Sequence, residues 1–577
     1  MVKISTGACN DAGPGYEKLI IQIPHMLTIK HQSTIEKAVK ANHERAFYSQ
    51  YPEHPKAYGE QAPEEGHNRF KAQLNTPFSQ LLQSGESGWA GEEVSPYTME
   101  PLGITYPLFT ADDLVEKAVA AAPQWRNTTV DIRADILVET LERIQSYFFD
   151  IAYATMHTTG QSFMMSFQAS GPHANDRALE AIAMGYHELN RYPAEQLWEK
   201  PMGKFALQLK KNFRAMPKGP GLVIGCSTFP VWNSLPGIYA DLVTGNPVIV
   251  KPHPRAILPI AIAVSAIQQV LQEKGFNPNL CQLAADTSAT PITKTLCEHP
   301  GIKLIDYTGG SQFGNYVESL PGKSVFTEKA GVNSVILDSV TDIDAVMQNL
   351  AFSVSLYSGQ MCTAPQNFFI PAGGIQTPNG TLSFDEVVEK FKNAVTALVT
   401  NPKMGAGTLG ALQNDTTLQR AHNAGKLGAK VILEGQPLVN EEFTHARGFT
   451  PAILQVDSAD RHIFEQELFG PVLLLVKTKD TDESIQLARQ MAQQHGAITC
   501  AAYAISPDTK EKITEAMNSV FTPVSFNFTG FIWVNQHAAF SDFHVTGGNP
   551  AGNASFTNPE FILRRFVWVG NREVTGS

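Results

Sequence analysis

The sequence predicts an α/β protein with two domains, each built on a mainly parallel sheet. Between residues 219 and 333 short β-type runs alternate with helical runs, and the same alternation starts again after residue 344. Such alternation is typical of parallel sheets that helices cover on both faces. A chain of 577 residues is also long enough for two to four domains with substantial cores.

The composition indicates a globular enzyme rather than a nucleic-acid-binding or membrane protein. Hydrophobic residues make up 43% and charged residues 17%, and the net charge of −11 is spread without a basic run. The longest apolar run, residues 257–267, is too short to cross a bilayer, and the first residues lack the apolar segment of a secretion signal. We expect no nucleic acid or membrane partner and a cytoplasmic location.

The cysteines and histidines show no metal-binding pattern. The six cysteines stand at positions 9, 226, 281, 297, 362 and 500 without paired spacing. Neither Cys-x-x-Cys nor His-Glu-x-x-His occurs, and His253 and the other histidines fit surface or packing positions. We expect no metal site and a reducing compartment.

The first part of the chain reads as an extension followed by helices. Residues 1–105 are rich in Gly, Pro, His and Gln, with a helical patch at 34–49, and we expect them to wrap a larger body. Apolar spacing then predicts helices over residues 112–121, 131–150 and 176–189, with Asp112 and Asp131 at N-caps. Residues 205–216 alternate apolar and basic side chains. This pattern fits a surface hairpin or a hairpin that pairs with a neighbouring chain.

The first strand–helix unit is the most regular part of the sequence. Its predicted strands are residues 221–225, 248–251, 280–284 and 303–307, and its predicted helices are 232–243, 257–274, 292–299 and 311–320. Ligands bind such sheets beyond the carboxyl ends of the strands. Those ends hold residues 227–230, 251–254 and 308–314.

A second unit follows. Its predicted strands are residues 368–370, 431–433, 472–476, 498–504 and 531–534, and its predicted helices are 344–357, 384–398, 416–425, 482–493 and 508–519. Residues 561–570 form an apolar, β-rich tail, which would be an aggregation-prone edge unless another strand pairs with it.

Cys362 and Glu328 are the candidate reacting groups. Cys362 stands in a loop after Gly359, where a thiol can be a nucleophile and its backbone N–H can help bind an oxyanion, although most cysteines are inert packing residues. Glu328 precedes it by 34 residues, at the end of a β-type run. It is either a solvated glutamate near a turn or a general base aimed at water.

Three further features suit a nucleotide, and each has an ordinary alternative. Gly309 and Gly310 lie between a strand and a helix, where glycines let the backbone approach a pyrophosphate or merely form a turn. Lys251 ends a strand and either reaches solvent or contacts a ribose or phosphate. Glu467 precedes the turn that Phe469 begins, and either caps the turn or accepts hydrogen bonds from sugar hydroxyls.

Taken together, these motifs resemble the aldehyde dehydrogenase superfamily over residues 110–570. The motifs that carry the resemblance are Phe229-Pro230, Thr244-Gly-Asn246, Val250-Lys-Pro252, Tyr307-Thr-Gly309, Glu328-x-x-Gly331, Gly359-Gln-x-Cys362 and Glu467-x-Phe-Gly-Pro471. Within the superfamily, residues 226–233 and 250–254 look like the phenylacetic acid degradation (PaaN-type) branch.

The resemblance implies the following organisation. Residues 1–105 are an extension, 106–329 a Rossmann-like NAD(P)-binding domain interrupted by an arm hairpin at 203–216, 330–555 the α/β catalytic domain, and 556–577 the last arm strand. The β-hairpin arm implies assembly into a homodimer or homotetramer.

The resemblance also implies roles for single residues. The Cys362 thiolate attacks an aldehyde to give a thiohemiacetal, hydride leaves to the nicotinamide, and Glu328 activates the water that hydrolyses the thioester. Lys251 corresponds to the lysine at the adenine-side ribose. The remaining cofactor contacts are assigned to Ser227, Gly309, Gly310 and Ser311 near the pyrophosphate, and to Glu467 and Phe469 around the nicotinamide and its ribose.

Three positions depart from the pattern. The oxyanion-hole asparagine is Thr228, so either its hydroxyl or another donor, such as Asn233, would serve. A lysine on the following helix is replaced by Gly237. The ribose-binding glutamate is replaced by Pro254, and without that carboxylate a 2′-phosphate is not repelled, so NADP is favoured at least as much as NAD.

Three functions remain open from the sequence. The first is NAD(P)-dependent oxidation of a small-molecule aldehyde to its acid, the implied substrate being a semialdehyde of phenylacetate or other aromatic catabolism, free or CoA-linked. The second is a CoA-acylating dehydrogenase, which Glu328 argues against because thiolysis needs no activated water. The third is a non-catalytic cofactor-binding scaffold, suggested by Thr228 and Gly237 and opposed by Cys362 and Glu328.

Overall fold

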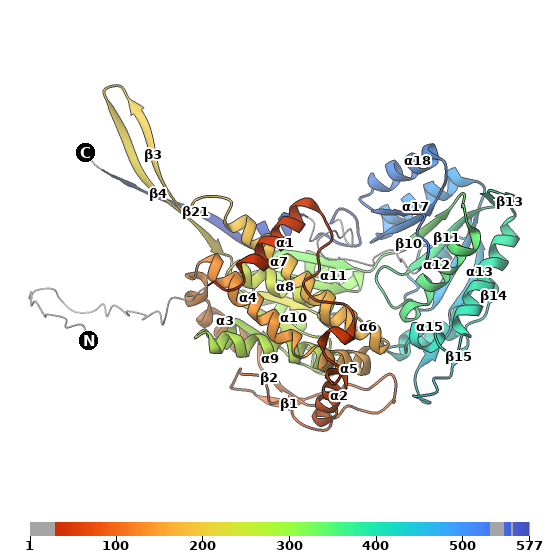
Figure 1. The fold of residues 1–577 in the computed structure, drawn as a ribbon, viewed down its shortest axis with the longest axis horizontal. Helices are drawn as coiled ribbons and strands as arrows, with labels where there is room; N and C mark the ends of the chain where they lie inside the picture. The colour runs from red at the N-terminus through yellow and green to blue at the C-terminus, as the bar shows by residue number, and fades with distance from the viewer. Residues whose placement is uncertain (1–28, 531–546, 555–557, 576–577) are drawn as a thin grey trace, which may run out of the picture.

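Two α/β lobes and a projecting three-stranded arm make up the computed structural model (Figure 1). The structure describes residues 29–530, 547–554 and 558–575. We call the part around the first sheet the first lobe and the part around the second sheet the second lobe. The strand predicted at residues 531–534 lies outside the described residues.

The first lobe contains a five-stranded parallel sheet in the order β7-β6-β5-β8-β9. Its strands are β5 (Gly221–Ile224), β6 (Val248–Lys251), β7 (Cys281–Leu283), β8 (Leu304–Gly309) and β9 (Ser324–Lys329). The helices between them are α8 (Pro230–Val243), α9 (Leu258–Glu273), α10 (Thr293–Glu298) and α11 (Ser311–Glu318). These strands are Val-, Ile- and Leu-rich and largely buried, as in a sheet that helices cover on both faces. The prediction for this unit is confirmed.

Helices from the first part of the chain cover the first lobe. They are α1 (Gln32–Glu44), α2 (Ala62–Gln73), α3 (Ala111–Arg126), α4 (Val130–Gln145), α5 (Phe148–Thr159), α6 (Phe163–Gln168) and α7 (Ala174–Leu189). The single helix predicted over residues 131–150 is wrong, because the chain breaks between α4 and α5.

The predicted N-caps are also wrong. Thr110 caps α3, its hydroxyl accepting a hydrogen bond from the backbone N–H of Asp113, and Thr129 stands at the N-cap of α4. Asp112 and Asp131 lie in the first turns instead. There their charges complement the positive end of the helix dipole without capping the helix.

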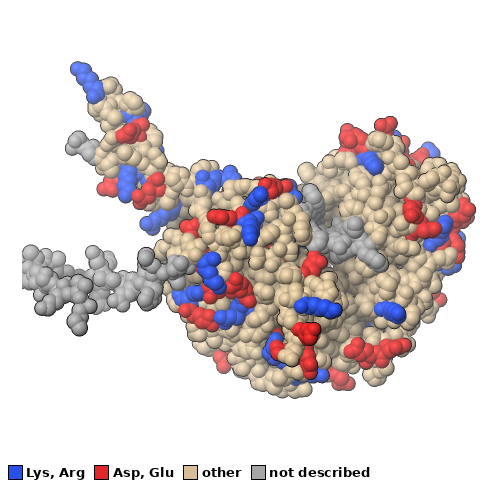
Figure 2. Space-filling view, viewed as in Figure 1, with Lys and Arg blue, Asp and Glu red and all other residues tan. Residues whose placement is uncertain are grey.

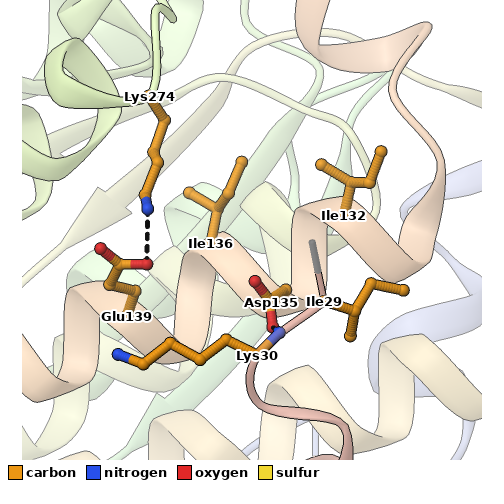
Figure 3. Close-up of a pocket in the computed structure, with 7 residues that line it drawn as sticks. All are labelled: Ile29, Lys30, Ile132, Asp135, Ile136, Glu139 and Lys274. Atoms are coloured by element: carbon orange, nitrogen blue, oxygen red, sulfur yellow. Dashed lines mark hydrogen bonds and ion pairs between the residues drawn. The ribbon is translucent and has the colours of Figure 1, made fainter. Parts of the chain in front are cut away.

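Residues 29–105 pack on the first lobe. At the start of this segment, Asp135 of α4 accepts hydrogen bonds from the backbone N–H groups of Lys30 and His31, at 2.7 and 2.6 Å. Ile29 lies beside Ile132 of the same helix, and a nearby ion pair joins Lys274 to Glu139 of α4 (Figure 3). Further on, β1 (Gly88–Ala90) and β2 (Tyr106–Leu108) form a small antiparallel sheet.

The arm is a three-stranded antiparallel ribbon in the order β21-β4-β3 that projects from the first lobe (Figure 1). Its strands are β3 (Glu195–Met202), β4 (Phe205–Pro217) and β21 (Phe566–Val574). The predicted hairpin was too short, because residues 205–216 are a single strand whose partner begins at Glu195. The tail strand was predicted to begin at residue 561, but β21 begins at Phe566 because the helical turn α19 (Glu560–Leu563) precedes it.

The second lobe contains a seven-stranded sheet in the order β14-β17-β18-β11-β10-β19-β20, parallel except between β14 and β17. Its strands are β10 (Asn333–Leu337), β11 (Pro365–Pro371), β14 (Lys430–Leu433), β17 (Ala452–Asp457), β18 (Val472–Thr478), β19 (Cys500–Tyr503) and β20 (Val524–Phe526). The sequence prediction missed β10, β17 and β20. The most important is β10, which lies inside the sheet between β11 and β19 and begins only a few residues after β9.

Helices again cover this sheet. The longer ones are α12 (Ile343–Ser355), α13 (Phe384–Val399), α15 (Asp415–Asn423), α17 (Thr481–His495) and α18 (Pro507–Asn518), and α14 (Gly405–Leu409) and α16 (Arg461–Phe464) are single turns. On the face drawn in Figure 2, acidic and basic side chains are interspersed rather than gathered by sign. No helix within the described ranges is long and apolar enough to cross a membrane.

Candidate active site

A cleft of about 790 Å³ is lined by residues of both lobes. Its first wall comes from the carboxyl ends of β5, β8 and β9, and its second wall from the Cys362 loop, residues 413–420 and the turn at residues 467–469. This volume is within the usual range for a small-molecule or cofactor site. The carboxyl ends of the parallel strands in the first lobe therefore do line this cleft.

The turn before Cys362 has an unusual backbone. Tyr357, Ser358 and Gly359 have φ values of 51°, 50° and 67°, all in the left-handed region. A non-glycine residue in that region is strained, and such strain persists only where surrounding contacts hold it. Here the Tyr357 hydroxyl donates to the carbonyl of Thr159 at 2.5 Å, and the Ser358 hydroxyl donates to that of Leu409 at 3.0 Å.

Two amide side chains fix the rest of the Cys362 loop. Gln360 donates to the carbonyl of Ala411 at 3.0 Å and accepts from the backbone N–H of Gln413 at 2.9 Å. Asn333, at the start of β10, donates to the carbonyl of Cys362 itself at 2.7 Å. The thiol is therefore carried by a rigid loop, as a nucleophile requires.

Cys362 and Glu328 face each other in the cleft. Burial raises the pKa of the Cys362 thiol well above its usual range, and the charge of Glu328 and a hydrogen bond to it act in the same direction. The buried guanidinium of Arg177, stacked 3.7 Å from the Trp232 ring centroid, opposes this shift. A carboxyl group that can accept the thiol proton therefore stands beside Cys362.

Thr228 and Asn233, the two candidate oxyanion donors, both line the cleft. The Thr228 hydroxyl lies 4.0 Å from the sulfur of Cys226, and the Thr228 carbonyl accepts from Gln161. The side-chain amide of Asn233 donates to Glu328 at 3.3 Å. The Asn233 amide is therefore already used in a hydrogen bond to Glu328, whereas the Thr228 hydroxyl has only a long contact with sulfur and is the donor more easily turned toward an oxyanion.

A steric constraint explains why residue 237 is glycine rather than lysine. A Cβ at this position of α8 would lie 2.9 Å from the carboxyl carbon of Asp306. Asp306 is held by Arg565, which comes from the far end of the chain and also pairs with Asp241. A lysine at residue 237 does not fit beside this buried cluster.

The glycines between β8 and α11 lie in the cleft, together with Ser227. A Cβ added at Gly310 would meet no atom within 4 Å, whereas one at Gly309 would lie 2.5 Å from the Tyr307 hydroxyl. The backbone at Gly310 is thus open to close approach by an anion. Ser311, in contrast, is outside the cleft lining, and its hydroxyl donates to the carbonyl of Ala330 at 3.3 Å.

Lys251 does not line the cleft either. Its ammonium is almost fully buried and pairs with Asp286 at 2.6 Å. Burial lowers the pKa of Lys251, and Asp286 opposes the change. The neighbouring His253 and Arg255 reach the cleft instead. Burial, with the charges of Lys251 and Arg255, lowers the pKa of His253 to about 4.

Glu467 and Phe469 line the second wall. Solvent reaches the Glu467 side chain from the open cleft, yet partial desolvation by the surrounding walls raises the pKa of its carboxyl to about 7, while Arg420 opposes the shift. Arg420 also donates to the carbonyl of Phe469 at 2.5 Å, which ties α15 to this turn.

Some lining residues were not predicted from the sequence. They are polar or charged side chains on loops and helices to which the sequence analysis gave no role in the site, namely Cys226, His253, Arg255, Ser288, Lys294, Gln413, Asn414 and Arg420. Ser288 is held by Glu92, which accepts hydrogen bonds from its backbone N–H at 3.0 Å and from its hydroxyl. The chain before residue 105 thereby contacts the rim of the cleft.

A nicotinamide dinucleotide fits the residues of this cleft. The cleft has the required size, the backbone at Gly310 is open for phosphate, and a carboxyl group stands at Glu467 for sugar hydroxyls. Among the described residues, no three His, Cys, Asp or Glu side chains are grouped as metal ligands.

Comparison with known proteins agrees with this geometry. The profile of the "Aldehyde dehydrogenase family" matches residues 86–549. A solved NAD-dependent aldehyde dehydrogenase from Burkholderia multivorans is 44% identical, with a TM-score of 0.92 over 95% of this chain and 98% of that one. The 1-pyrroline-5-carboxylate dehydrogenase 1 of Halalkalibacterium halodurans is 25% identical over 65% of this chain and 71% of its own length.

More distant structures share the fold. A mutant form of the 1-pyrroline-5-carboxylate dehydrogenase of Thermus thermophilus is 18% identical, with a TM-score of 0.72 over 92% of this chain and 99% of that one. The chain therefore belongs to the aldehyde dehydrogenase family. It is an NAD(P)-dependent enzyme of that family, and its general reaction is oxidation of an aldehyde.

Proposed function

We propose that Cys362 is the nucleophile and Glu328 the general base of an aldehyde dehydrogenase that releases a free carboxylic acid. The observation that carries this proposal is the pairing of the two groups in a cleft that also offers a glycine cradle and a sugar-binding carboxyl. A scaffold without catalysis would need neither group.

The first half of the reaction forms a covalent intermediate. Glu328 takes the thiol proton, the sulfur of Cys362 adds to the aldehyde carbon, and the carbonyl oxygen becomes an oxyanion. The Cys362 backbone N–H and the Thr228 hydroxyl are the proposed donors to that oxyanion. When bound, the nicotinamide ring supplies the acceptor for the hydride that leaves the carbon.

The second half releases the acid. After the proton taken from the thiol has passed from Glu328 to solvent, Glu328 removes a proton from water, the hydroxide attacks the thioester carbon, and the sulfur of Cys362 leaves as the thiolate. The rival product, an acyl-CoA, would form if a CoA thiol attacked instead of water. Glu328 beside Cys362 supports hydrolysis.

The proposed cofactor contacts divide along the cleft. Gly309, Gly310 and Ser227 are proposed to hold the pyrophosphate, and Glu467 with Phe469 the nicotinamide side. Lys251 and Ser311 lie outside the lining, so we propose that they act through their neighbours. Lys251 would fix the loop that presents His253.

We propose that NADP is accepted at least as well as NAD. Pro254 removes a carboxylate that would repel a 2′-phosphate, and Arg255 and Lys294 bring positive charge to the lining of the cleft. Arg255 follows Pro254 directly, which is the strongest support.

For the substrate, we propose a semialdehyde of aromatic catabolism, with CoA-linked forms included. The support is the likeness of residues 226–233 and 250–254 to the PaaN-type branch. The α-ketoglutaric semialdehyde dehydrogenase of Bacillus subtilis, 23% identical over 66% of this chain and 76% of its own length, shows that relatives act on semialdehydes.

We also propose the domain boundaries near residues 105, 329 and 555, and a homodimer or homotetramer joined through the arm. The first sheet ends at Lys329 and the second begins at Asn333, which supports the middle boundary. The arm carries exposed apolar side chains, including Leu197, Phe205 and Val567, which support pairing with another chain.

The test is a steady-state panel of aromatic, aliphatic and CoA-linked aldehydes with NADP or NAD, each with and without free CoA. We expect turnover without CoA, release of the free acid, and loss of at least 1,000-fold in Cys362→Ala. Absolute dependence on CoA would overturn the hydrolytic assignment. Equal rates in wild type and Cys362→Ala would overturn the nucleophile.

A further inference from the structure

A short hydrogen-bonded chain leads to Glu328 from the first wall of the cleft. The thiol of Cys226 donates to the side-chain oxygen of Asn233 at 3.5 Å, and the Asn233 amide donates to Glu328 Oε1 at 3.3 Å. All three side chains line the cleft, and Glu328 also contacts Cys362. This series of hydrogen bonds therefore links Cys226 to Cys362 through the amide of Asn233 and the carboxylate of Glu328.

The direction of these bonds leaves Asn233 no equivalent alternative orientation. Its oxygen faces a thiol that can donate, and its NH₂ group faces a carboxylate that can only accept when ionised. Turning the amide over would place two oxygens against each other at Glu328. The carboxylate thus sets the orientation of the Asn233 amide, and Cys226 supports that orientation by donating to the amide oxygen.

The position of Asn233 in helix α8 holds its side chain in place. Residue 233 lies in the first turn of α8, which begins at Pro230 directly after β5, and α8 is buried along most of its length. Its Cα is therefore fixed by the core rather than by a loop. A donor on a rigid element is suited to holding a neighbouring group in one place.

We propose that Asn233, oriented by Cys226, is a positioning residue that holds Glu328 ionised and turned toward Cys362. This inference rests on the proposed role of Glu328 as the base. It assigns Asn233 to the base rather than to the oxyanion, and it gives Cys226 a function distinct from that of the nucleophile.

A hydrogen bond to an ionised carboxylate favours the ionised form. Loss of the Asn233 amide should therefore move the acid limb of kcat to higher pH, by about half to one pH unit. Asn233→Asp keeps the shape but places a second carboxylate beside Glu328, so its shift should exceed one unit. At pH values well below the midpoint of the acid limb we expect kcat to fall by about 3- to 10-fold in Asn233→Ala, with the KM for the cofactor unchanged.

The Cys226 variants test the orientation step. Cys226→Ser keeps a donor and should behave as wild type, whereas Cys226→Ala should show a smaller shift in the same direction as Asn233→Ala. The matched control is Ser234→Ala, the next residue of α8, whose buried hydroxyl has no hydrogen-bond partner among the described residues. Its pH profile should match wild type.

The experiment measures kcat from pH 5 to 9, and the burst of reduced cofactor, for these variants and for Glu328→Gln. The inference is supported if Asn233→Ala and Asn233→Asp move the acid limb upward in that order. It is overturned if both keep the wild-type midpoint while Glu328→Gln loses the limb, and in that case the base assignment stands. If Glu328→Gln keeps both the limb and the rate, the base assignment itself fails and the inference with it.

Discussion

Glu467 is the residue whose protonation changes closest to neutrality in the proposed cofactor site. Its carboxyl has a pKa raised to about 7 by partial desolvation, and Arg420 limits the shift. An ionised carboxylate accepts hydrogen bonds from both hydroxyls of a ribose, whereas the protonated acid gives up one acceptor position to its own proton.

Cofactor binding should therefore weaken as the pH falls through 7. We expect the Kd for NADPH to be constant above about pH 8 and to rise by up to 10-fold per unit below pH 6. Glu467→Gln should bind more weakly at pH 8 and lose the pH dependence. Fluorescence titration of NADPH from pH 5.5 to 8.5 measures both, and a wild-type Kd that does not vary with pH would contradict the assignment.

Arg255 and Lys294 should discriminate between the two cofactors. Truncating either to alanine should raise the KM for NADP about 10-fold and leave the KM for NAD within 2-fold, because a charged partner of the 2′-phosphate is worth about 1.5–3 kcal/mol. Lys200→Ala, on the exposed arm strand β3, is the charge-matched control. Equal effects on both cofactors would contradict the proposed phosphate contact.

At the scale of elements, the buried cluster of Arg565 ties the last strand to the first lobe. Its guanidinium binds Asp241 of α8 at 2.6 Å and Asp306 of β8 at 2.5 and 2.7 Å, and none of it is exposed. The cluster thereby joins the segment that enters β21 to α8 and β8. Because two carboxylates depend on one cation, removing the cation leaves both uncompensated.

Arg565→Ala should lower the free energy of unfolding by about 3–5 kcal/mol, the cost of breaking a buried charge pair. The control is Arg564→Ala, which removes the adjacent arginine and one hydrogen bond to the carbonyl of Val325, and should cost no more than about 1.5 kcal/mol. Denaturant unfolding of the two variants gives the comparison. A similar decrease in the free energy of unfolding for both variants would show that the buried ion pairs of Arg565 contribute no more to stability than the single hydrogen bond of Arg564.

The sequence predicted the first sheet well because its strands are short buried runs that regular helices separate. It missed β10 for a physical reason. Asn333–Leu337 follows β9 after a gap too short to hold a helix, so the sequence pattern looks like one continuous strand, although β10 belongs to the other sheet. Only the packing of the second lobe separates the two.

The arm shows a similar limit. The alternation of β4 was visible, but β3 contains Pro201 and alternates poorly, and β21 comes from the far end of the chain. Pairing across that distance is set by the whole fold rather than by local pattern.

At the scale of the whole molecule, we expect the arm to join chains. Val567 and Val569 are exposed on β21, and Leu197 is exposed on β3. Val567→Asp combined with Val569→Asp should lower the molar mass measured by light scattering to that of a smaller assembly. Val439→Asp, at an exposed apolar residue of the second lobe, should leave the mass unchanged. A double variant with the wild-type mass would argue against assembly through this strand.

The residues of the candidate site could be predicted from the sequence only in part. Cys362, Glu328 and Glu467 could be selected because each stands in a recognisable motif. The pairing of Asn233 with Glu328, and the cations Arg255 and Lys294 in the cleft lining, could not be selected, because only the closed fold brings these groups together.

The central claim is that Cys362 carries the acyl group and Glu328 admits water to it. The direct measurement is intact-protein mass spectrometry of Glu328→Gln after one addition of NADP and the best aldehyde of the panel. We predict that one adduct per chain, equal to the aldehyde less two hydrogens and mapped to Cys362, accumulates together with one equivalent of NADPH, more slowly than the wild-type burst because Glu328 no longer takes the thiol proton. NADPH formed without an adduct, or an adduct that persists in Cys362→Ala, would contradict the account.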